Sequence, residues 1–391
     1  MFASRIAGDL APNPLSEALR HRRAAGEPVI DLTESNPTRV GLDYPTDLLA
    51  ALADCRGLTY APQPLGLMEA RAAVAVDYQR RGIAIDPDRV AVTASTSEAY
   101  SLLFKLLAAP GDEIAVPRPS YPLFEHLTAL EGLIARAYDL EYNGAWSIDF
   151  SSLERALGPR TRALLLVNPN NPTGSFASQD ELDRLAAACA RLDVALIVDE
   201  VFADYMLEPG EAGRAAPALT RDDLLTFALG GLSKSIGLPQ VKLGWIAAAG
   251  PTGLVDAALG RLEMICDTYL SVSTPVQLAA AELLDRGGSV RAQISTRIAA
   301  NYCRLKDLVA RLPSCRVLHA AGGWSAILQV PTFRSEEELV VTLVSQDGVL
   351  AHPGYFFDFP RESFLILSLL PPEPSFAEGV GRLLARAVQA A

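Results

Sequence analysis

Two short segments of this 391-residue chain are apolar at every position, and they constrain its fold more than any other feature. They are Ala163–Val167 and Val194–Val198. A strand with one face in water alternates polar and apolar residues, so uninterrupted apolar runs of this length predict strands that are covered on both faces. Such strands are typical of parallel sheets packed between helices. At about 150 residues per domain, the length predicts two to three domains.

Four further strands and intervening helices extend this pattern. The strands are expected over Arg89–Thr93, Glu113–Val116, Arg136–Asp139 and Leu224–Leu229. Helices are expected over Ser97–Leu107 and Gln179–Arg191. Ser178 and Glu181 form a capping-box signature before the second helix, and Ser151 and Glu154 repeat it before a shorter one. The alternation predicts an α/β fold: a three-layer α/β/α domain with a mainly parallel, doubly wound sheet and right-handed crossovers.

The pattern changes near Ser271, which predicts a second, smaller domain of the α+β type. A long helical stretch is followed by the apolar segments Gly322–Val330 and Phe364–Leu370. We expect the N-terminal segment to pack with this domain. The predicted division is therefore a large domain over residues 45–270 and a small domain formed by residues 1–44 with 271–391.

Composition excludes several classes of function. A net charge of −12 and a pI near 4.9 argue against binding to nucleic acid or to an anionic membrane, because both need a basic face. No apolar run reaches the roughly 18 residues of a membrane span, and the N-terminus lacks a signal-peptide layout. Five scattered cysteines and four histidines offer no zinc spacing. We expect a cytoplasmic enzyme with free thiols and no metal.

Ligands of open α/β sheets bind at the carboxyl ends of the strands, so the residues that follow each strand are the candidate site. The first strand runs into Ser95, Thr96 and Ser97 at a helix N-terminus, where N–H groups and the helix dipole favour a phosphate. A plain N-cap explains these hydroxyls equally well. The second strand is followed by Tyr121 between two prolines, and the fourth by a turn that contains Asn171. Packing and turn formation are the alternatives there.

The fifth and sixth predicted strands end in groups of opposite charge. Asp199 directly follows an apolar strand, where a carboxylate is costly without a positive partner or hydrogen-bond donors. Lys234 follows Ser233 in an apolar, glycine-containing segment, and burial makes such an amine nucleophilic toward carbonyls. A phosphate cradle, an aromatic ring, a carboxylate and a lysine amine together match the needs of pyridoxal 5′-phosphate (PLP).

The chain also resembles the class I/II aminotransferases of fold-type I PLP enzymes (the aspartate aminotransferase-like family), over nearly its whole length. The motifs that carry the resemblance are Val167–Gly174, Val198–Phe202, Gly231–Pro239 and His352–Gly354 before Phe357. The resemblance implies that Lys234 forms a Schiff base with the cofactor and carries the proton, while Asp199 pairs with the pyridine nitrogen. It also implies that Asn171 bonds the phenolic oxygen and Tyr121 stacks on the ring.

The resemblance further implies a homodimer with shared active sites. Ser95, Thr96, Ser97 and Ser233 would lie near the phosphate, and Tyr60, in Thr59-Tyr-Ala-Pro, matches a tyrosine that family members donate to the neighbouring subunit's phosphate.

Two departures from the family pattern concern the cofactor. Phe202 stands where a tyrosine usually bonds the phenolic oxygen, so we expect a raised Schiff-base pKa. Lys242 replaces the phosphate-binding arginine of the family, and Gly231 stands where many members have a serine. Lysine keeps the charge but cannot form a bidentate fork, which predicts a more weakly held cofactor.

A third departure concerns the substrate. The arginine that usually clamps the substrate carboxylate, two residues before a serine in the last strand, is replaced by Ile366. Either another cation takes over, or the substrate lacks an ordinary α-carboxylate. The candidate cations and substrate contacts are Arg39, Arg118, Arg361, Asn36 and Asn171. Trp324 is either a pocket residue or part of the core.

The sequence therefore predicts a PLP-dependent aminotransferase that acts on an amino acid or amine by a ping-pong mechanism, with an amino donor and a keto acceptor. The same fold supports other outcomes, so a lyase or β-eliminase, a decarboxylase and an oxygen-using PLP enzyme stay open. A non-catalytic PLP-fold protein is the alternative from another class. The sequence does not identify the donor, the acceptor or the pathway.

Overall fold

The computed structural model describes residues 3, 5–6, 11–207 and 216–389. Within these residues the centre of the molecule is an eight-stranded sheet with the order β2-β9-β8-β7-β6-β3-β4-β5. Its strands are β2 (Val90–Thr93), β3 (Glu113–Arg118), β4 (Ile134–Tyr142), β5 (Trp146–Ile148), β6 (Thr161–Val167), β7 (Ala195–Asp199), β8 (Thr226–Gly231) and β9 (Gly244–Ala249). The run β8-β7-β6-β3-β4 is parallel, whereas β9 and β5 are antiparallel to their neighbours.

All six predicted strands are present, and the mainly parallel α/β fold is confirmed. The two apolar runs became β6 and β7, which lie side by side with Val167 opposite Asp199. Their residues are buried on both faces, as the absence of alternation predicted. The strands β5 and β9 were not predicted. The capping box of Ser178 and Glu181 is confirmed, but the shorter helix is capped by Asp149 and not by Ser151. Asp149 lies two residues before Ser151, and its carboxylate accepts from the Ser151 N–H.

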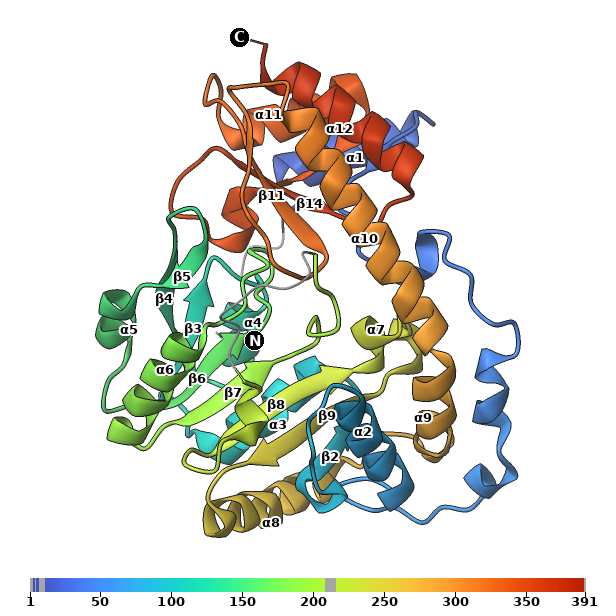
Figure 1. Cartoon of the computed structure of the whole chain (residues 1–391), viewed down its shortest axis with the longest axis vertical. Helices are drawn as coiled ribbons and strands as arrows, with labels where there is room; N and C mark the ends of the chain where they lie inside the picture. The colour runs from blue at the N-terminus through green and yellow to red at the C-terminus, as the bar shows by residue number, and fades with distance from the viewer. Residues whose placement is uncertain (1–2, 4, 7–10, 208–215, 390–391) are drawn as a thin grey trace.

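Helices cover both faces of this sheet (Figure 1). One face packs against α3 (Thr96–Leu107), α4 (Phe124–Leu130) and α8 (Thr252–Tyr269). The other face packs against α5 (Phe150–Ala156) and α6 (Gln179–Leu192) at one end, and against α2 (Met68–Arg80) and α9 (Thr274–Arg286) at the other. The short helix α7 (Leu232–Ser235) follows β8 directly.

A second core lies above the sheet, toward the top of Figure 1. It joins the N-terminal helix α1 (Pro14–Ala24) to α10 (Gly288–Val309), α11 (Glu336–Thr342) and α12 (Glu373–Ala387). Its strands are β1 (Ile30–Asp31) paired with β12 (Val349–Leu350), and the antiparallel sheet of β10 (Arg316–Val317), β11 (Ser325–Gln329), β14 (Phe364–Ser368) and β13 (His352–Pro353). The N-terminal and C-terminal segments thus share a core, while the division at residues 45 and 271 stays a prediction. Residues 1–2, 4 and 7–10 of the predicted small domain lie outside the described residues.

Two general features bear on the expected class of protein. In the part of the chain that the structure describes, no helix combines the length and the apolar character needed to cross a membrane. The five cysteines are all free thiols.

Candidate functional site

A cavity of about 390 Å³ lies at the carboxyl ends of the central strands, below the second core. Strands β6, β7 and β8 end there, and α3 begins there. The opposite wall comes from the second core and carries Trp324, Ser325 and Ser368, with Ser35 beside them. Ten of the residues predicted from the sequence line this one cavity: Ser95, Thr96, Ser97, Tyr121, Asn171, Asp199, Phe202, Ser233, Lys234 and Lys242.

Asp199 is the last residue of β7 and is 8% exposed. Its carboxylate accepts from the Tyr100 hydroxyl at 2.8 Å and from the Val201 N–H at 3.0 Å. Burial raises the pKa of Asp199 to about 6, although these two hydrogen bonds favour the ionised form. A buried carboxylate with a raised pKa is suited to a protonated ring nitrogen, because that partner supplies the missing positive charge.

Lys234 lies in α7, at the end of β8. Its Nζ lies 5.0 Å from the centre of the Trp324 ring and 5.7 Å from that of Phe202. Burial lowers the pKa of Lys234, and the Asp199 carboxylate opposes this shift. The backbone of α7 is held from behind, because the Tyr205 hydroxyl donates to the Lys234 carbonyl at 2.5 Å. This arrangement places an amine with an increased neutral fraction inside the cavity.

Hydroxyls and N–H groups gather at the start of α3. Ser95 is the N-cap, and its Oγ accepts from the Glu98 N–H, as the N-cap alternative predicted. The N–H groups of Thr96 and Ser97 have no intrahelical partner, so this helix end retains the ability to bind an anion. Gly244 allows close approach here, since a Cβ at that position would lie 3.0 Å from the Ser95 backbone.

Ser233 and Lys242 complete this end of the cavity. Lys242 is exposed and has a left-handed backbone with φ 60°.

Three predicted residues lie between the two ends of the cavity. Tyr121 is 37% exposed, and its ring meets Phe124 edge to face at 5.9 Å. Asn171 accepts a hydrogen bond from Ser325 at 3.1 Å through its side-chain oxygen. Phe202 is buried and packs edge to face on Trp324 at 5.4 Å. The structure therefore brings these side chains around the same space as Lys234 and Asp199.

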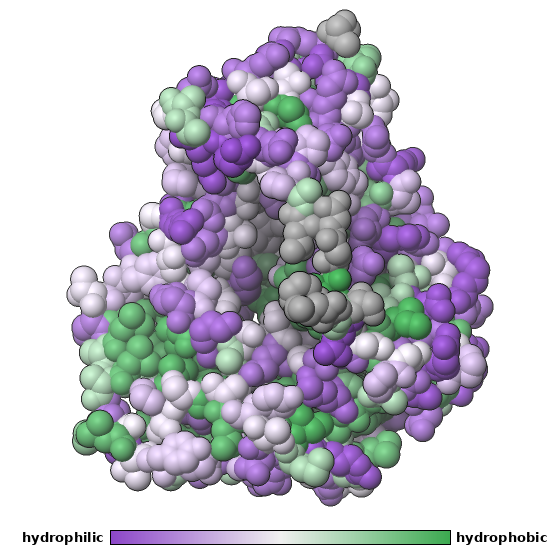
Figure 2. Space-filling model, turned by 180° about the vertical axis from the view of Figure 1, so that it is seen from behind, coloured by the Kyte–Doolittle hydropathy of each residue, from purple (hydrophilic) through white to green (hydrophobic). Residues whose placement is uncertain are grey.

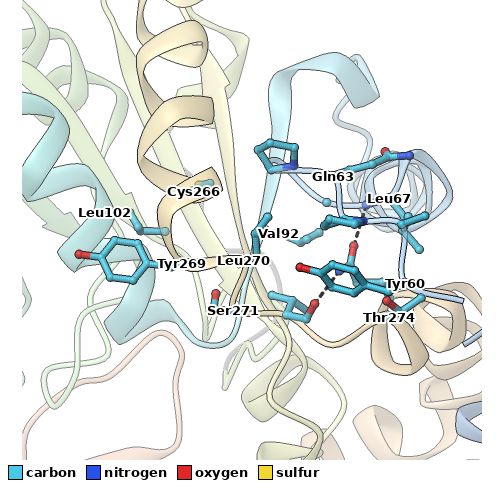
Figure 3. A pocket seen from close by; sticks show the side chains of 16 residues that line it. Tyr60, Gln63, Leu67, Val92, Leu102, Cys266, Tyr269, Leu270, Ser271 and Thr274 are labelled. Carbon is cyan, nitrogen blue, oxygen red and sulfur yellow. Dashed lines mark hydrogen bonds between the residues drawn. The ribbon is translucent and has the colours of Figure 1, made fainter. Parts of the chain in front are cut away.

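Five other predicted residues do not line the cavity: Tyr60, Asn36, Arg39, Arg118 and Arg361. Tyr60 is 78% exposed and lies in a separate pocket with Gln63 and Thr274 (Figure 3). Asn36 uses its side chain to accept from the Thr38 N–H and hydroxyl.

None of the three arginines in this group lines the cavity. Arg361 lies over the Phe364 ring, 5.7 Å from its centre. Arg39 is exposed in the turn Pro37–Arg39. Arg118 pairs with Asp139, with Nη2 and Oδ1 2.6 Å apart.

The sequence did not reveal Tyr100, Ser325, Ser368 or Ser35 as site residues. Tyr100 lies in the second turn of α3, inside the helix and not at a strand end, so the search at strand ends did not include it. Ser368 was present in the prediction only as the landmark two residues after Ile366. Ser368 is the polar last residue of an otherwise apolar strand. Polar residues at strand ends identified most of the site, so the same rule could have identified Ser368. The sequence left open whether Trp324 lines the pocket or belongs to the core. In the structure it lines the cavity and is also part of the second core.

The chemical groups that line this cavity match the parts of PLP. An anion site of helix N–H groups and hydroxyls lies at one end, a buried carboxylate is positioned for a ring nitrogen, and a buried amine is available for an aldehyde. The indole Nε1 of Trp324 is buried and has no hydrogen-bond partner among the described residues. A buried unpaired donor beside a cavity is an indication that a ligand completes the site.

Known proteins share both the sequence pattern and the fold. A profile of the family described as aminotransferase class I and II matches residues 27–373. The glutamate-pyruvate aminotransferase AlaA of Haemophilus influenzae is 26% identical over 378 residues, which cover 94% of this chain and 92% of that protein. An alanine aminotransferase of Mycobacterium tuberculosis is 25% identical over 384 residues, covering 95% and 88% of the two chains.

Solved structures of aminotransferases also superpose on this chain over nearly its whole length. The alanine aminotransferase of Pyrococcus furiosus superposes with a TM-score of 0.86 at 25% identity and covers 98% of this chain and 99% of its own. An aspartate aminotransferase of Thermus thermophilus gives a TM-score of 0.84 at 21% identity, which shows likeness in fold alone; the match covers 99% of each chain.

Proposed function

Because this chain belongs to the class I and II aminotransferases and is therefore a PLP-dependent enzyme, we propose that Lys234 and Asp199 are its catalytic residues. The reaction we propose transfers an amino group from an amino donor to a keto acceptor by a ping-pong mechanism. The observation that carries this proposal is that the two residues share one cavity, where burial lowers the pKa of Lys234 and raises that of Asp199. Paired shifts of this kind are typical of catalytic groups.

Bound PLP supplies an aldehyde for amines and a ring that accepts the electrons released at the substrate carbon. Lys234 would hold the cofactor covalently through Nζ and, once displaced by substrate, would accept and return a proton in its neutral form. Asp199 would keep the ring nitrogen protonated. Tyr100 bonds one carboxylate oxygen and the Val201 N–H bonds the other, which fixes the group, and each oxygen keeps a second lone pair that can accept from the ring.

The other lining residues would orient the cofactor. The start of α3, with Ser95, Thr96 and Ser97, would hold the phosphate with Ser233 and Lys242. Tyr121 would cover one ring face. The side-chain nitrogen of Asn171 is available as a donor to the phenolic oxygen, because its oxygen already accepts from Ser325.

We also propose a homodimer in which Tyr60 reaches the partner's cavity. Tyr60 lies outside the cavity of its own chain and is 78% exposed, and Figure 3 shows its ring near Thr274 in a different pocket. Large apolar side chains around it are exposed, including Leu58 at 90%, Leu49 at 44% and Met68 at 46%. Figure 2 shows apolar surface gathered at the lower left, on the side where Figure 1 draws α9 and the segment before α2. Such surface favours a protein interface.

Borohydride fixation tests the catalytic proposal directly. Protein reconstituted with PLP is reduced, digested and analysed by mass spectrometry, and we expect the cofactor mass on the peptide that contains Lys234. Lys234→Ala should abolish both the label and transamination. Lys105→Ala removes a lysine outside the cavity, where it pairs with Glu131, and is the matched control. A label on another lysine, or retained transamination by Lys234→Ala, would contradict the proposal.

Mixing two inactive variants tests the shared site. We expect Lys234→Ala and Tyr60→Ala to be inactive alone. In a mixed dimer, one site combines an intact Lys234 with an intact Tyr60 from the other chain, so random mixing should restore about a quarter of the wild-type activity. No recovery despite subunit exchange would refute donation of Tyr60 between chains.

A cytoplasmic location is part of the same proposal. Five free thiols in the described residues support a reducing compartment. Fractionation of the producing cells would test it.

A further inference from the structure

The substrate side of the cavity is lined by uncharged groups. Opposite the ends of β6, β7 and β8, the wall consists of Ser35, Trp324, Ser325 and Ser368. Among the described residues that line the cavity, the cations are Lys234 and Lys242, and both belong to the proposed cofactor machinery. A substrate carboxylate on this wall would therefore lack a guanidinium partner within the described chain.

None of the three arginines suggested by the sequence lines the cavity. Arg118 forms a two-contact pair with Asp139, at 2.6 Å from Nη2 and 2.8 Å from Nε. Arg361 lies over the Phe364 ring at 5.7 Å, in a different cavity. Arg39 is exposed and does not line the site.

Ile366 is apolar and buried, and it is not among the residues that line the cavity. In β14, Ile366 and Ser368 are two residues apart and therefore lie on the same face of the strand. Ile366 is 3% exposed and packs with Leu318, Ile327 and Phe357. Hydrophobic packing thus fills the position from which an arginine would extend toward Ser368.

The hydroxyl groups on this wall present acceptors to the cavity. The Ser325 hydroxyl donates its proton to Asn171 at 3.1 Å, and the Ser368 hydroxyl donates to the Glu34 carbonyl at 2.7 Å. Each serine has one proton. The Ser368 Oγ also accepts from the Leu370 N–H at 3.3 Å, so a lone pair of each hydroxyl remains for a ligand. Oxygen acceptors repel a carboxylate but accept from a hydroxyl.

The Trp324 N–H on the same wall has no acceptor among the described residues, and a hydroxyl oxygen is a suitable acceptor for it.

We propose that the amino donor is a primary amine whose amine-bearing carbon carries a neutral hydroxyl-containing substituent, as in an amino alcohol, in place of a carboxylate. This inference rests on the proposed function. A carboxylate transferred to this wall would lose water without gaining a guanidinium from the described lining residues, which is costly. A hydroxyl both donates and accepts, and this matches two serine acceptors and one indole donor. The specificity-determining residues on the wall are Ser325, Trp324 and Ser368, and Ile366 leaves no guanidinium at the neighbouring position of β14.

Matched substrate pairs test this inference on the wild-type holoenzyme. L-alaninol is compared with L-alanine, and L-phenylalaninol with L-phenylalanine, by single-turnover loss of the cofactor's visible band. We expect each alcohol to have at least about a tenfold higher kcat/KM, since sites built on hydrogen bonds discriminate strongly against the wrong partner. A faster or equal reaction of the amino acids would overturn the inference.

Calorimetry adds a measurement that does not depend on turnover. The unreactive 3-phenylpropanol should bind the holoenzyme at least about tenfold more tightly than 3-phenylpropanoate. Any other ranking, including no measurable binding of the alcohol, overturns the inference. Failure of the proposed function is seen separately, because borohydride would then fix no cofactor on Lys234.

Two variants locate the preference in the wall. Ser368→Ala removes an acceptor and should lower the preference for the alcohol several-fold. Ser345→Ala is the matched control, because Ser345 lies outside the cavity and its hydroxyl donates to the Val341 carbonyl. Ile366→Arg should raise the reaction with amino acids relative to alcohols, and Ile366→Met keeps the apolar character as its control. Unfolding temperature is measured for each variant. An unchanged preference in folded Ser368→Ala and Ile366→Arg would also overturn the inference.

Discussion

Tyr100→Phe is expected to change how Asp199 titrates, because it removes one of the two hydrogen bonds on that carboxylate. The Tyr100 hydroxyl donates to Asp199 at 2.8 Å from a fully buried position on α3. Phenylalanine keeps the ring and its edge-to-face contact with Phe124. The ionised carboxylate then retains the Val201 N–H and loses its other donor.

The size of the effect follows from the value of such a bond. A hydrogen bond to a charged group contributes about 1.5–3 kcal/mol. One pKa unit corresponds to about 1.4 kcal/mol, so the pKa of Asp199 should rise by about 1–2 units. It starts at about 6 in the wild-type protein, which places it at about 7–8 in Tyr100→Phe.

Cofactor affinity measured against pH reports this shift. Asp199 is ionised above its pKa, so affinity that depends on the carboxylate is lost as the pH falls through that value. The midpoint should move from near 6 to about 7–8, and the dissociation constant at pH 7 should rise about two- to tenfold. Fluorescence titration of the cofactor-free protein with PLP measures both.

Protein stability should follow the same linkage. The ionised Asp199 is a cost to the folded state above its raised pKa. Tyr100→Phe should therefore lower the free energy of unfolding by about 1.5–3 kcal/mol more at pH 8.5 than at pH 5, where Asp199 is mostly protonated in both proteins.

Tyr138→Phe is the matched control. Tyr138 is also fully buried, but its hydroxyl donates to the Leu165 carbonyl at 2.7 Å on the opposite face of the sheet. It should leave the pH midpoint of cofactor binding unchanged. The same midpoint in Tyr100→Phe, Tyr138→Phe and wild type would refute the reasoning.

Three further outcomes are expected. Phe202→Tyr adds a donor near the cofactor's phenolic oxygen and should lower the pH midpoint of the visible absorption by about one unit; an unchanged titration would contradict this. Lys242→Arg restores a guanidinium fork at the phosphate and should tighten PLP binding about three- to tenfold in the same fluorescence titration. Leu165→Ala truncates a fully buried side chain of β6 and should cost about 2–5 kcal/mol in urea unfolding, whereas Leu254→Ala, half exposed on α8, should cost under about 0.5 kcal/mol.

The fold could be predicted where a local sequence pattern is compatible with a single kind of secondary structure and burial. Uninterrupted apolar runs gave β6 and β7, because only strands covered on both faces are apolar throughout. The strand β9 has the same burial, but its sequence Gly244-Trp-Ile-Ala-Ala-Ala249 is rich in alanine, which has little preference for strands. The strand β5 has three residues, Trp146–Ile148, too few to show alternation. Both were missed because the neighbouring strands, and not their own sequences, determine them.

Site residues on strand ends could be predicted for a topological reason. Parallel strands bring their carboxyl ends to one edge, so residues as distant as Ser95, Asn171 and Lys234 had to meet. Tyr100 could not be found this way. It lies inside a helix whose apolar positions include Ala99 and Leu103, and its hydroxyl reaches Asp199 only because α3 packs across that part of the sheet. Such a contact depends on packing between elements and leaves no periodic signal.

The position of Lys234 illustrates the same dependence on distant parts of the chain. Helix α7 has four residues, too few to be stable alone, and its last carbonyls lack helical partners. Tyr205 bonds the Lys234 carbonyl, and Arg291 of α10 donates to the Ser235 carbonyl at 2.9 Å. Arg291 is itself held by Asp77 of α2 at 3.1 Å. Helix α10 continues into the second core, where Ile298 and Leu305 are buried. The contacts of Arg291 therefore connect the segment that carries Lys234 to the second core. The segment around Lys234 identifies the residue, but elements before and after it in the sequence fix its place.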